Sequence, residues 1–259
     1  MDPIDDSRPS PDTATLRIRS NLEAIHAEVS VACQRANRDP RSVTILPVTK
    51  YVDIDLVRQL HAAGGRDIGE STIQETLRKR EGLVDLCDMH WHLIGHLQRN
   101  KVSRALEYFD TIHSLDSRRL AETLDRRLAS RPREGVRFYV QVNVGGESAK
   151  YGLPPNELDA FLDWLMQETA IHSRVAGLMT VAPRSEKIEG ARPYFRQLRE
   201  LRDHGVDRGL LPKNAGLSMG MSRDFTVAIE EGATVVRIGS RLFEGLPSRR
   251  RNKPDRKPS

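Results

Sequence analysis

The sequence predicts one α/β domain of the (β/α)₈ TIM-type barrel class, with an additional N-terminal helix. Short β-rich runs alternate with amphipathic helical segments along most of the chain, and eight such runs can be identified. The 259 residues suffice for one domain of roughly 200 to 250 residues. Eight alternating repeats of this length fit a closed barrel better than an open doubly wound sheet.

The first predicted element is a helix over residues 13–37, where apolar side chains recur at helical spacing. Asn37 and then Pro40 interrupt the pattern and predict its end. Residues 1–12 hold four aspartates and three prolines and lack the basic start and apolar stretch of a secretory signal. We therefore expect a flexible N-terminal tail over 1–12.

The predicted strands follow in order at 43–48, 66–68, 90–94, 111–113, 137–142, 175–178, 216–217 and 234–238. The helices predicted between them cover 53–63, 73–81, 98–105, 117–129, 155–168, 187–204 and 222–230. Several begin at residues that commonly cap helices: Asp53, Ser71, Asp116 or Ser117, Asn156 and Ser222. No linker interrupts the series, so 13–245 is predicted to form one barrel and 246–259 a basic, disordered C-terminal tail.

The composition narrows the function classes. Hydrophobic residues make up 38% and charged residues 30%, which is typical of a globular protein, and no apolar run approaches the roughly 20 residues of a membrane helix. Residues 248–259 contain six basic residues and one acidic residue, which accounts for the whole net charge of +5. The remaining chain is neutral overall, so we expect no nucleic-acid or membrane partner. Two distant cysteines, Cys33 and Cys87, favour a reducing, cytoplasmic location.

A lysine stands where the first strand ends. Lys50 closes the run LPVTK at 46–50. In barrels of this class the reactive groups come from the carboxyl ends of the strands, and an amine beside apolar residues is a candidate for Schiff-base chemistry. The alternative is a strand-end lysine that extends its amine to water.

Two later segments are predicted to hold a phosphate, because phosphate often binds after strands seven and eight of such barrels. Gly239 permits close backbone approach, and Ser218, Ser222 and Ser240 add hydroxyl donors. If Ser222 caps the next helix, the helix N-terminus adds positive potential. The alternative is a set of ordinary turn and cap residues. Strands one and eight are neighbours in a closed barrel, so a phosphorylated aldehyde held here could reach Lys50.

Arg237 lies two residues before Gly239 and, by strand alternation, shares its direction. A guanidinium can only donate hydrogen bonds, so facing a pyridine nitrogen it would keep that nitrogen unprotonated and weaken the ring as an electron sink. The alternative is an exposed arginine in an ion pair.

Several motifs in this order resemble the pyridoxal phosphate homeostasis proteins (the YggS/PROSC family) over roughly residues 15–245. They are LPVTK (46–50), IGES (68–71), WHLIGHLQRNK (91–101), HSLDS (113–117), VQVNVGGESAKYG (140–152), GLMTVAP (177–183), LSMGMSRDF (217–225) and VRIGSRLF (236–243). The motifs WHLIGHLQRNK and SMGMSRDF are highly specific for that family.

The resemblance implies a single barrel similar to the N-terminal domain of alanine racemase, with pyridoxal 5′-phosphate (PLP) attached to Lys50 as an internal aldimine. It implies that some residues contact the phosphate of PLP, that Arg237 faces the pyridine nitrogen, and that Asn143, Met179 and Met219 line the cofactor pocket. The implied cofactor-binding residues are Lys50, Asn143, Met179, Ser218, Met219, Ser222, Arg237, Gly239 and Ser240. Ser71 and Tyr51 depart from the family pattern, where Asn and a small residue are usual.

The implied role is to hold PLP, buffer it and deliver it to PLP-dependent apoenzymes as a monomer without robust catalytic activity. An amino-acid racemase is the nearest enzymatic alternative, but it needs a second acid/base on the opposite face of the cofactor, for which only Tyr51 and Tyr151 are candidates. A metal-dependent hydrolase is suggested by His90, His92 and His96, with His113 as a further ligand. A pure interaction protein is the third class. The sequence assigns no catalytic or metal-ligating residue.

Overall fold

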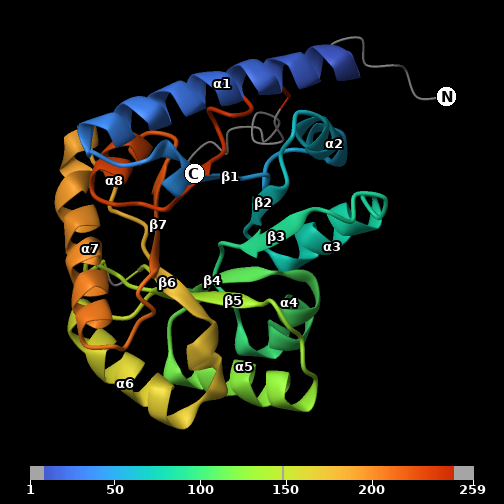
Figure 1. Cartoon of the computed structure of the whole chain (residues 1–259). Helices are drawn as coiled ribbons and strands as arrows, with labels where there is room; N and C mark the ends of the chain where they lie inside the picture. The colour runs from blue at the N-terminus through green and yellow to red at the C-terminus, as the bar shows by residue number, and fades with distance from the viewer. Residues whose placement is uncertain (1–8, 148, 248–259) are drawn as a thin grey trace, which may run out of the picture.

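The computed structural model describes residues 9–147 and 149–247. Eight parallel strands form one sheet in the order β1-β8-β7-β6-β5-β4-β3-β2. A parallel bridge between Val48 and Gly69 joins β1 to β2 and closes the sheet into a barrel (Figure 1). The strands are β1 (Thr44–Pro47), β2 (Asp67–Glu70), β3 (His90–Leu93), β4 (Thr111–Leu115), β5 (Arg137–Gln141), β6 (Val175–Met179), β7 (Gly216–Met221) and β8 (Val235–Ile238). The predicted (β/α)₈ barrel is confirmed.

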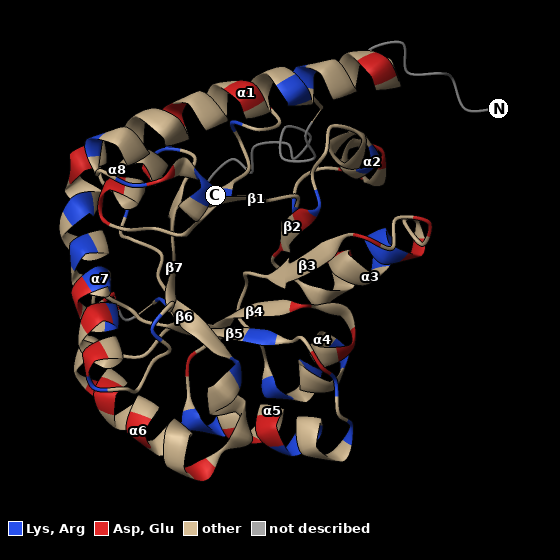
Figure 2. Ribbon diagram, in the orientation of Figure 1, with Lys and Arg blue, Asp and Glu red and all other residues tan. Residues whose placement is uncertain are grey.

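Helices follow the strands and cover the outside of the barrel (Figure 1). They are α2 (Ile54–Ala62), α3 (Ile73–Glu81), α4 (Val102–Tyr108), α5 (Arg118–Ser130), α6 (Leu158–Glu168), α7 (Arg192–Asp207) and α8 (Phe225–Glu230). Short 3₁₀ turns lie at Pro40–Ser42, Arg99–Lys101, Pro155–Glu157, Ala170–Arg174 and Ile188–Ala191. Basic and acidic residues are intermixed along α7 (Figure 2), as expected for a solvated helix face.

The additional N-terminal helix α1 (Pro11–Arg35) lies across α2 and α8, the helices that follow β1 and β7 (Figure 1). The Ser10 hydroxyl caps it by accepting a hydrogen bond from Thr13 N at 3.3 Å. A stripe containing Ile18, Ile25 and Val29 is buried. The helix starts two residues before the predicted boundary and ends at Arg35.

Strand alternation separates two apolar layers. In β8, Val236 and Ile238 belong to the large core between the strands and the helices, whereas Val235 belongs to a small cluster inside the barrel. The other buried members of that interior cluster are Leu46, Tyr139 and Met179. Arg237 has the same parity as Val235 and is 5% exposed, so its guanidinium also lies inside the barrel.

Two predicted boundaries are wrong in ways that affect the site. Strand β7 continues to Met221, so the SMGM segment is strand and not loop. Helix α8 begins only at Phe225 after Asp224, so Ser222 does not cap it. The cap of α3 is likewise Thr72 and not Ser71, because the Thr72 hydroxyl accepts from Glu75 N at 3.3 Å.

The predicted tails fall mainly outside the described residues, which begin at residue 9 and end at 247. Leu246 is described and is packed in the outer core at 6% exposed, so the packed region extends past the predicted boundary at 245. Within the described ranges no helix has the length and apolarity needed to cross a membrane.

Candidate functional site

The carboxyl ends of β1, β7 and β8 bring three predicted site residues close together. Gly239 follows β8 directly, and a Cβ added to it would lie 3.2 Å from the Val48 carbonyl oxygen. The Ser222 hydroxyl accepts a hydrogen bond from Gly239 N at 3.3 Å. Since Val48 is only two residues before Lys50, the lysine and the two late turns share one mouth of the barrel.

Lys50 lies half-buried in the turn after β1, with its Nζ atom 5.0 Å from the centre of the Tyr51 ring. The residue before it is firmly anchored. The Thr49 hydroxyl donates to Glu70 Oε1 at 2.5 Å, and Lys79 Nζ donates to the Thr49 carbonyl oxygen at 2.6 Å. Lys79 also pairs with Glu70 at 2.5 Å, and both side chains are fully buried. This cluster fixes the backbone from which Lys50 projects.

Arg237 is held inside the barrel by three oxygen atoms. Its Nη1 donates to the Ser218 carbonyl oxygen at 2.7 Å and to the Ser218 hydroxyl at 2.9 Å, and its Nη2 donates to the Thr180 carbonyl oxygen at 2.7 Å. Burial lowers the pKa of Arg237 to about 10, against the opposing effect of Asp224. The guanidinium therefore stays protonated at neutral pH and acts only as a donor.

Ser218 does not lie in the cluster formed by Ser222 and Gly239. It is fully buried within β7, and its hydroxyl stands between Arg237 and His113 Nδ1, which is 2.9 Å away. The reason is the length of β7, which makes Ser218 an inward-facing strand residue. Its predicted contact with phosphate has no support in this geometry.

The remaining predicted residues differ in placement. Met179 ends β6 and packs in the interior cluster. The Met219 side chain is fully buried in the outer core, on the other side of the sheet, so it does not line the mouth. The Asn143 amide donates to the carbonyl oxygens of Glu147 at 2.9 Å and Lys150 at 3.3 Å, and thereby shapes the loop after β5. Ser240 follows Gly239 at the mouth and is partly buried.

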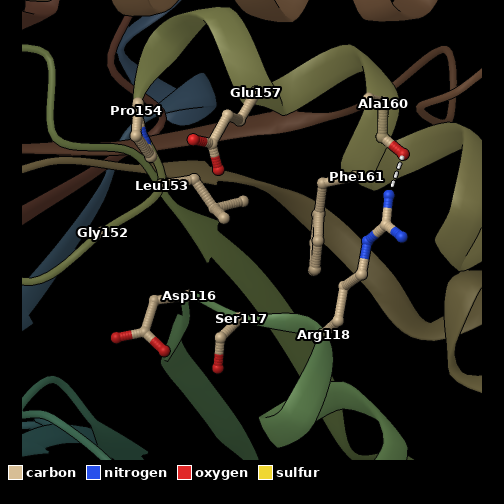
Figure 3. A pocket seen from close by; sticks show the side chains of 9 residues that line it. All are labelled: Asp116, Ser117, Arg118, Gly152, Leu153, Pro154, Glu157, Ala160 and Phe161. Carbon is tan, nitrogen blue, oxygen red and sulfur yellow. Dashed lines mark hydrogen bonds between the residues drawn. The ribbon is translucent and has the colours of Figure 1, made fainter.

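A separate pocket of about 470 Å³ lies beside the loops that follow β4 and β5 (Figure 3). Figure 3 shows Asp116 and Ser117 on one side and Leu153, Glu157 and Phe161 on the other. Burial raises the pKa of Asp116, and His96 at 3.3 Å opposes this shift. None of the nine predicted site residues lines this pocket.

The sequence analysis considered His92 and His113 only as metal ligands and missed their contact with each other inside the barrel. His92 Nδ1 lies 3.0 Å from His113 Nε2, and both rings face the interior. By strand alternation, Thr111 and His113 in β4 point to the same side of the sheet. This alternation was the available signal that His113 faces the barrel interior. Over the described ranges, no three His, Cys, Asp or Glu side chains are grouped so as to hold a metal ion.

The site can be compared with known proteins. Residues 20–247 match the family model described as the alanine racemase N-terminal domain. The chain is 41% identical over 222 residues to a pyridoxal phosphate homeostasis protein of Aquifex aeolicus. The aligned region covers 86% of this chain and 95% of the relative. It is 40% identical over 230 residues to the Pseudomonas aeruginosa protein of the same name, covering 87% and 94%.

One similar solved structure was determined with cofactor. PipY of Synechococcus elongatus, with PLP bound, superimposes with a TM-score of 0.74 at 35% identity and covers 87% of this chain and 99% of that one.

Proposed function

The chain belongs to the pyridoxal phosphate homeostasis protein family, and we propose that it holds PLP at the mouth formed by β1, β7 and β8. The family is named for cofactor homeostasis and not for a reaction. PLP supplies an electrophilic aldehyde and an electron-withdrawing ring when it is bound. The residues at this mouth fit such a molecule, because they offer an amine, a close backbone approach and a buried guanidinium.

Each group has a distinct proposed role. Lys50 would supply the amine that holds the aldehyde carbon of PLP, with the carbonyl oxygen leaving as water. The backbone at Gly239 and the hydroxyls of Ser222 and Ser240 receive the phosphate. Arg237 donates to the ring nitrogen and, because it stays protonated, leaves that nitrogen without a proton. Met179 contributes to the apolar wall.

The observation that carries the proposal is the position of Gly239. It lies against Val48, and its backbone N–H donates to the Ser222 hydroxyl, so a phosphate held there is within the span of one small molecule of Lys50. Any side chain at residue 239 would press on Val48 and displace this turn. The lysine and the anion-binding turn therefore act on the same ligand.

We further propose that the protein buffers PLP and passes it to apoenzymes in the cytoplasm as a monomer, without robust catalysis of its own. The imine bond is reversible, so transfer needs only displacement of Lys50 by an acceptor amine.

The proposal is tested by the visible absorption of the PLP-loaded protein, borohydride reduction and mass mapping of the reduced adduct. The adduct should map to Lys50, and Lys50→Ala should lose both the band and the adduct. Lys213→Ala is the matched control, because Lys213 is exposed and lies in the turn before β7, at the opposite end of the barrel. An unchanged spectrum in Lys50→Ala would refute the assignment. Rapid racemisation of single-enantiomer alanine would favour the racemase alternative.

A further inference from the structure

Five side chains form one continuous chain of hydrogen bonds through the barrel interior, which we call the interior relay. It runs from Arg237 Nη1 to Ser218 Oγ at 2.9 Å, then to His113 Nδ1 at 2.9 Å. From His113 Nε2 it continues to His92 Nδ1 at 3.0 Å, and from His92 Nε2 to Asp67 Oδ1 at 3.1 Å. Each residue comes from a different strand: β8, β7, β4, β3 and β2.

The two ends of the interior relay lie in different surroundings. Arg237 is buried and is the residue proposed to meet the PLP ring. Asp67 is the first residue of β2, at the amino end of the barrel, and its side chain is 36% exposed. The relay therefore connects the cofactor side of the barrel with solvent at the other end.

The directions of these hydrogen bonds follow when both histidines are neutral. A guanidinium can only donate and a carboxylate can only accept. His92 then donates from Nε2 to Asp67 and accepts at Nδ1 from His113 Nε2. His113 Nδ1 accepts from the Ser218 hydroxyl, which in turn accepts from Arg237. Both rings carry their proton on Nε2.

The surroundings of His113 favour the neutral ring. His113 is fully buried and stacks on Tyr139, with ring centres 4.6 Å apart and an interplanar angle of 12°. Burial is the main cause that holds the pKa of His113 well below its usual range, and the charge of Arg237 acts in the same direction. A proton added to this ring would place a second cation beside the buried guanidinium.

We propose that the interior relay positions Arg237 for its contact with the cofactor ring, and that Asp67 and His92 are distant positioning residues for that contact. Arg237 has no carboxylate in ion-pair contact among the described residues. It is met instead by two carbonyl oxygens and by the Ser218 hydroxyl, whose orientation depends on His113. Breaking the relay frees that hydroxyl to rotate and loosens the guanidinium. The inference rests on the proposed function only in taking PLP as the ligand that Arg237 faces.

The first test does not depend on PLP binding. Side-chain ¹⁵N shifts of the full-length protein, with and without PLP, report which nitrogen of each histidine carries the proton, and His92→Gln and His113→Gln assign the signals. Both residues should be Nε2–H tautomers at neutral pH. A proton on His113 Nδ1 would reverse two of the hydrogen bonds and overturn the relay as described.

The second test uses the PLP-loaded protein. Asp67→Asn and His92→Ala should shift the pH profile of the visible band and weaken PLP binding about threefold to tenfold, the effect of loosening one hydrogen bond to a charged group. The adduct should still map to Lys50. His90→Gln is the matched control, since His90 shares the strand and face of His92 but is exposed and outside the relay.

The two proposals fail in different ways. If Asp67→Asn and His92→Ala match His90→Gln in pH profile and affinity while the Lys50 adduct persists, the relay inference is wrong and the proposed function stands. If the wild-type protein gives no Lys50 adduct, the proposed function is wrong, and the tautomer measurement still decides the relay.

Discussion

At the scale of single residues, the site depends on a buried ion pair that touches no ligand. Lys79 and Glu70 are both fully buried, and together they hold Thr49 by its hydroxyl and its carbonyl oxygen. A buried pair contributes little net stability relative to apolar residues, but removing one partner leaves an uncompensated charge. The pair therefore acts mainly on the conformation of the turn that presents Lys50.

Lys79→Met should reduce the free energy of unfolding by about 3 to 5 kcal/mol, because it leaves the Glu70 carboxylate buried without its cation. The double variant Lys79→Met with Glu70→Gln should recover part of this loss, because the remaining polar group is neutral. Urea unfolding of the three proteins measures both effects. Equal stability of the single and double variants would contradict the explanation.

Gly239→Ala should weaken PLP binding strongly while changing stability by only about 1 kcal/mol. The added methyl group would lie 3.2 Å from the Val48 carbonyl oxygen and push the turn proposed to bind phosphate away from β1. Gly82→Ala is the control, since Gly82 follows α3 and its added methyl group would meet the flexible Ile54 side chain, with Cδ1 at 2.8 Å and Cγ2 at 3.3 Å. PLP titration followed by visible absorption distinguishes the two variants.

The free energy of unfolding should depend on pH through the ionisation of Asp67. The hydrogen bond from His92 lowers the pKa of the Asp67 carboxyl below its unfolded value. The carboxylate therefore stabilises the fold above the unfolded pKa of about 3.9, and this contribution is lost as pH falls through the lower folded pKa. Asp67→Asn should be less stable than wild type at pH 7, and the difference should shrink toward pH 3. A constant difference in urea midpoints would contradict this.

At the scale of elements, β7 shows what sequence patterns reveal and what they hide. Its serine, glycine and methionine residues have weak strand propensity, so only two of its six residues were predicted. The convergence of Lys50, Ser222 and Gly239 was predictable, because the carboxyl ends of parallel strands share one rim. The interior relay was not, because its contacts join five strands and leave no local signal in any one of them.

Gly220 is required by the end of β7. Its φ is +90°, and an added Cβ would lie 2.5 Å from the Ala228 Cβ in α8. Gly220→Ala should lower the free energy of unfolding by about 2 to 4 kcal/mol, from backbone strain and overpacking together.

Gly209→Ala separates the two causes. Gly209 has a φ of +72° but no atom within 4 Å of an added Cβ, so this variant reports strain alone and should lose about 1 kcal/mol. Urea unfolding measures both variants. Equal losses would show that contact with α8 is unimportant.

At the scale of the whole molecule, α1 is joined to the segment that follows β8, near the end of the described residues. Asn21 Nδ2 donates to the carbonyl oxygens of Leu242 at 2.9 Å and Glu244 at 3.1 Å, and Arg241 pairs with Glu28. These contacts fix the segment that follows Ser240. The helix predicted as an addition to the barrel thus supports the turn proposed to bind phosphate.

PLP should raise the melting temperature of the wild-type protein, because a ligand that binds only the folded state stabilises it by mass action. Lys50→Ala should show a smaller rise at the same PLP concentration, and Lys213→Ala should match wild type. Differential scanning calorimetry at several PLP concentrations measures this. Equal shifts in all three proteins would mean that Lys50 adds nothing to affinity.

The proposed ligand site joins a residue that follows β1 to a turn that follows β8, and these two strands pair directly although they are the first and last of the sheet. During synthesis Lys50 is made long before Gly239. The proposed site can therefore form only after β8 has been added to the barrel, so cofactor capture would report that the barrel has closed.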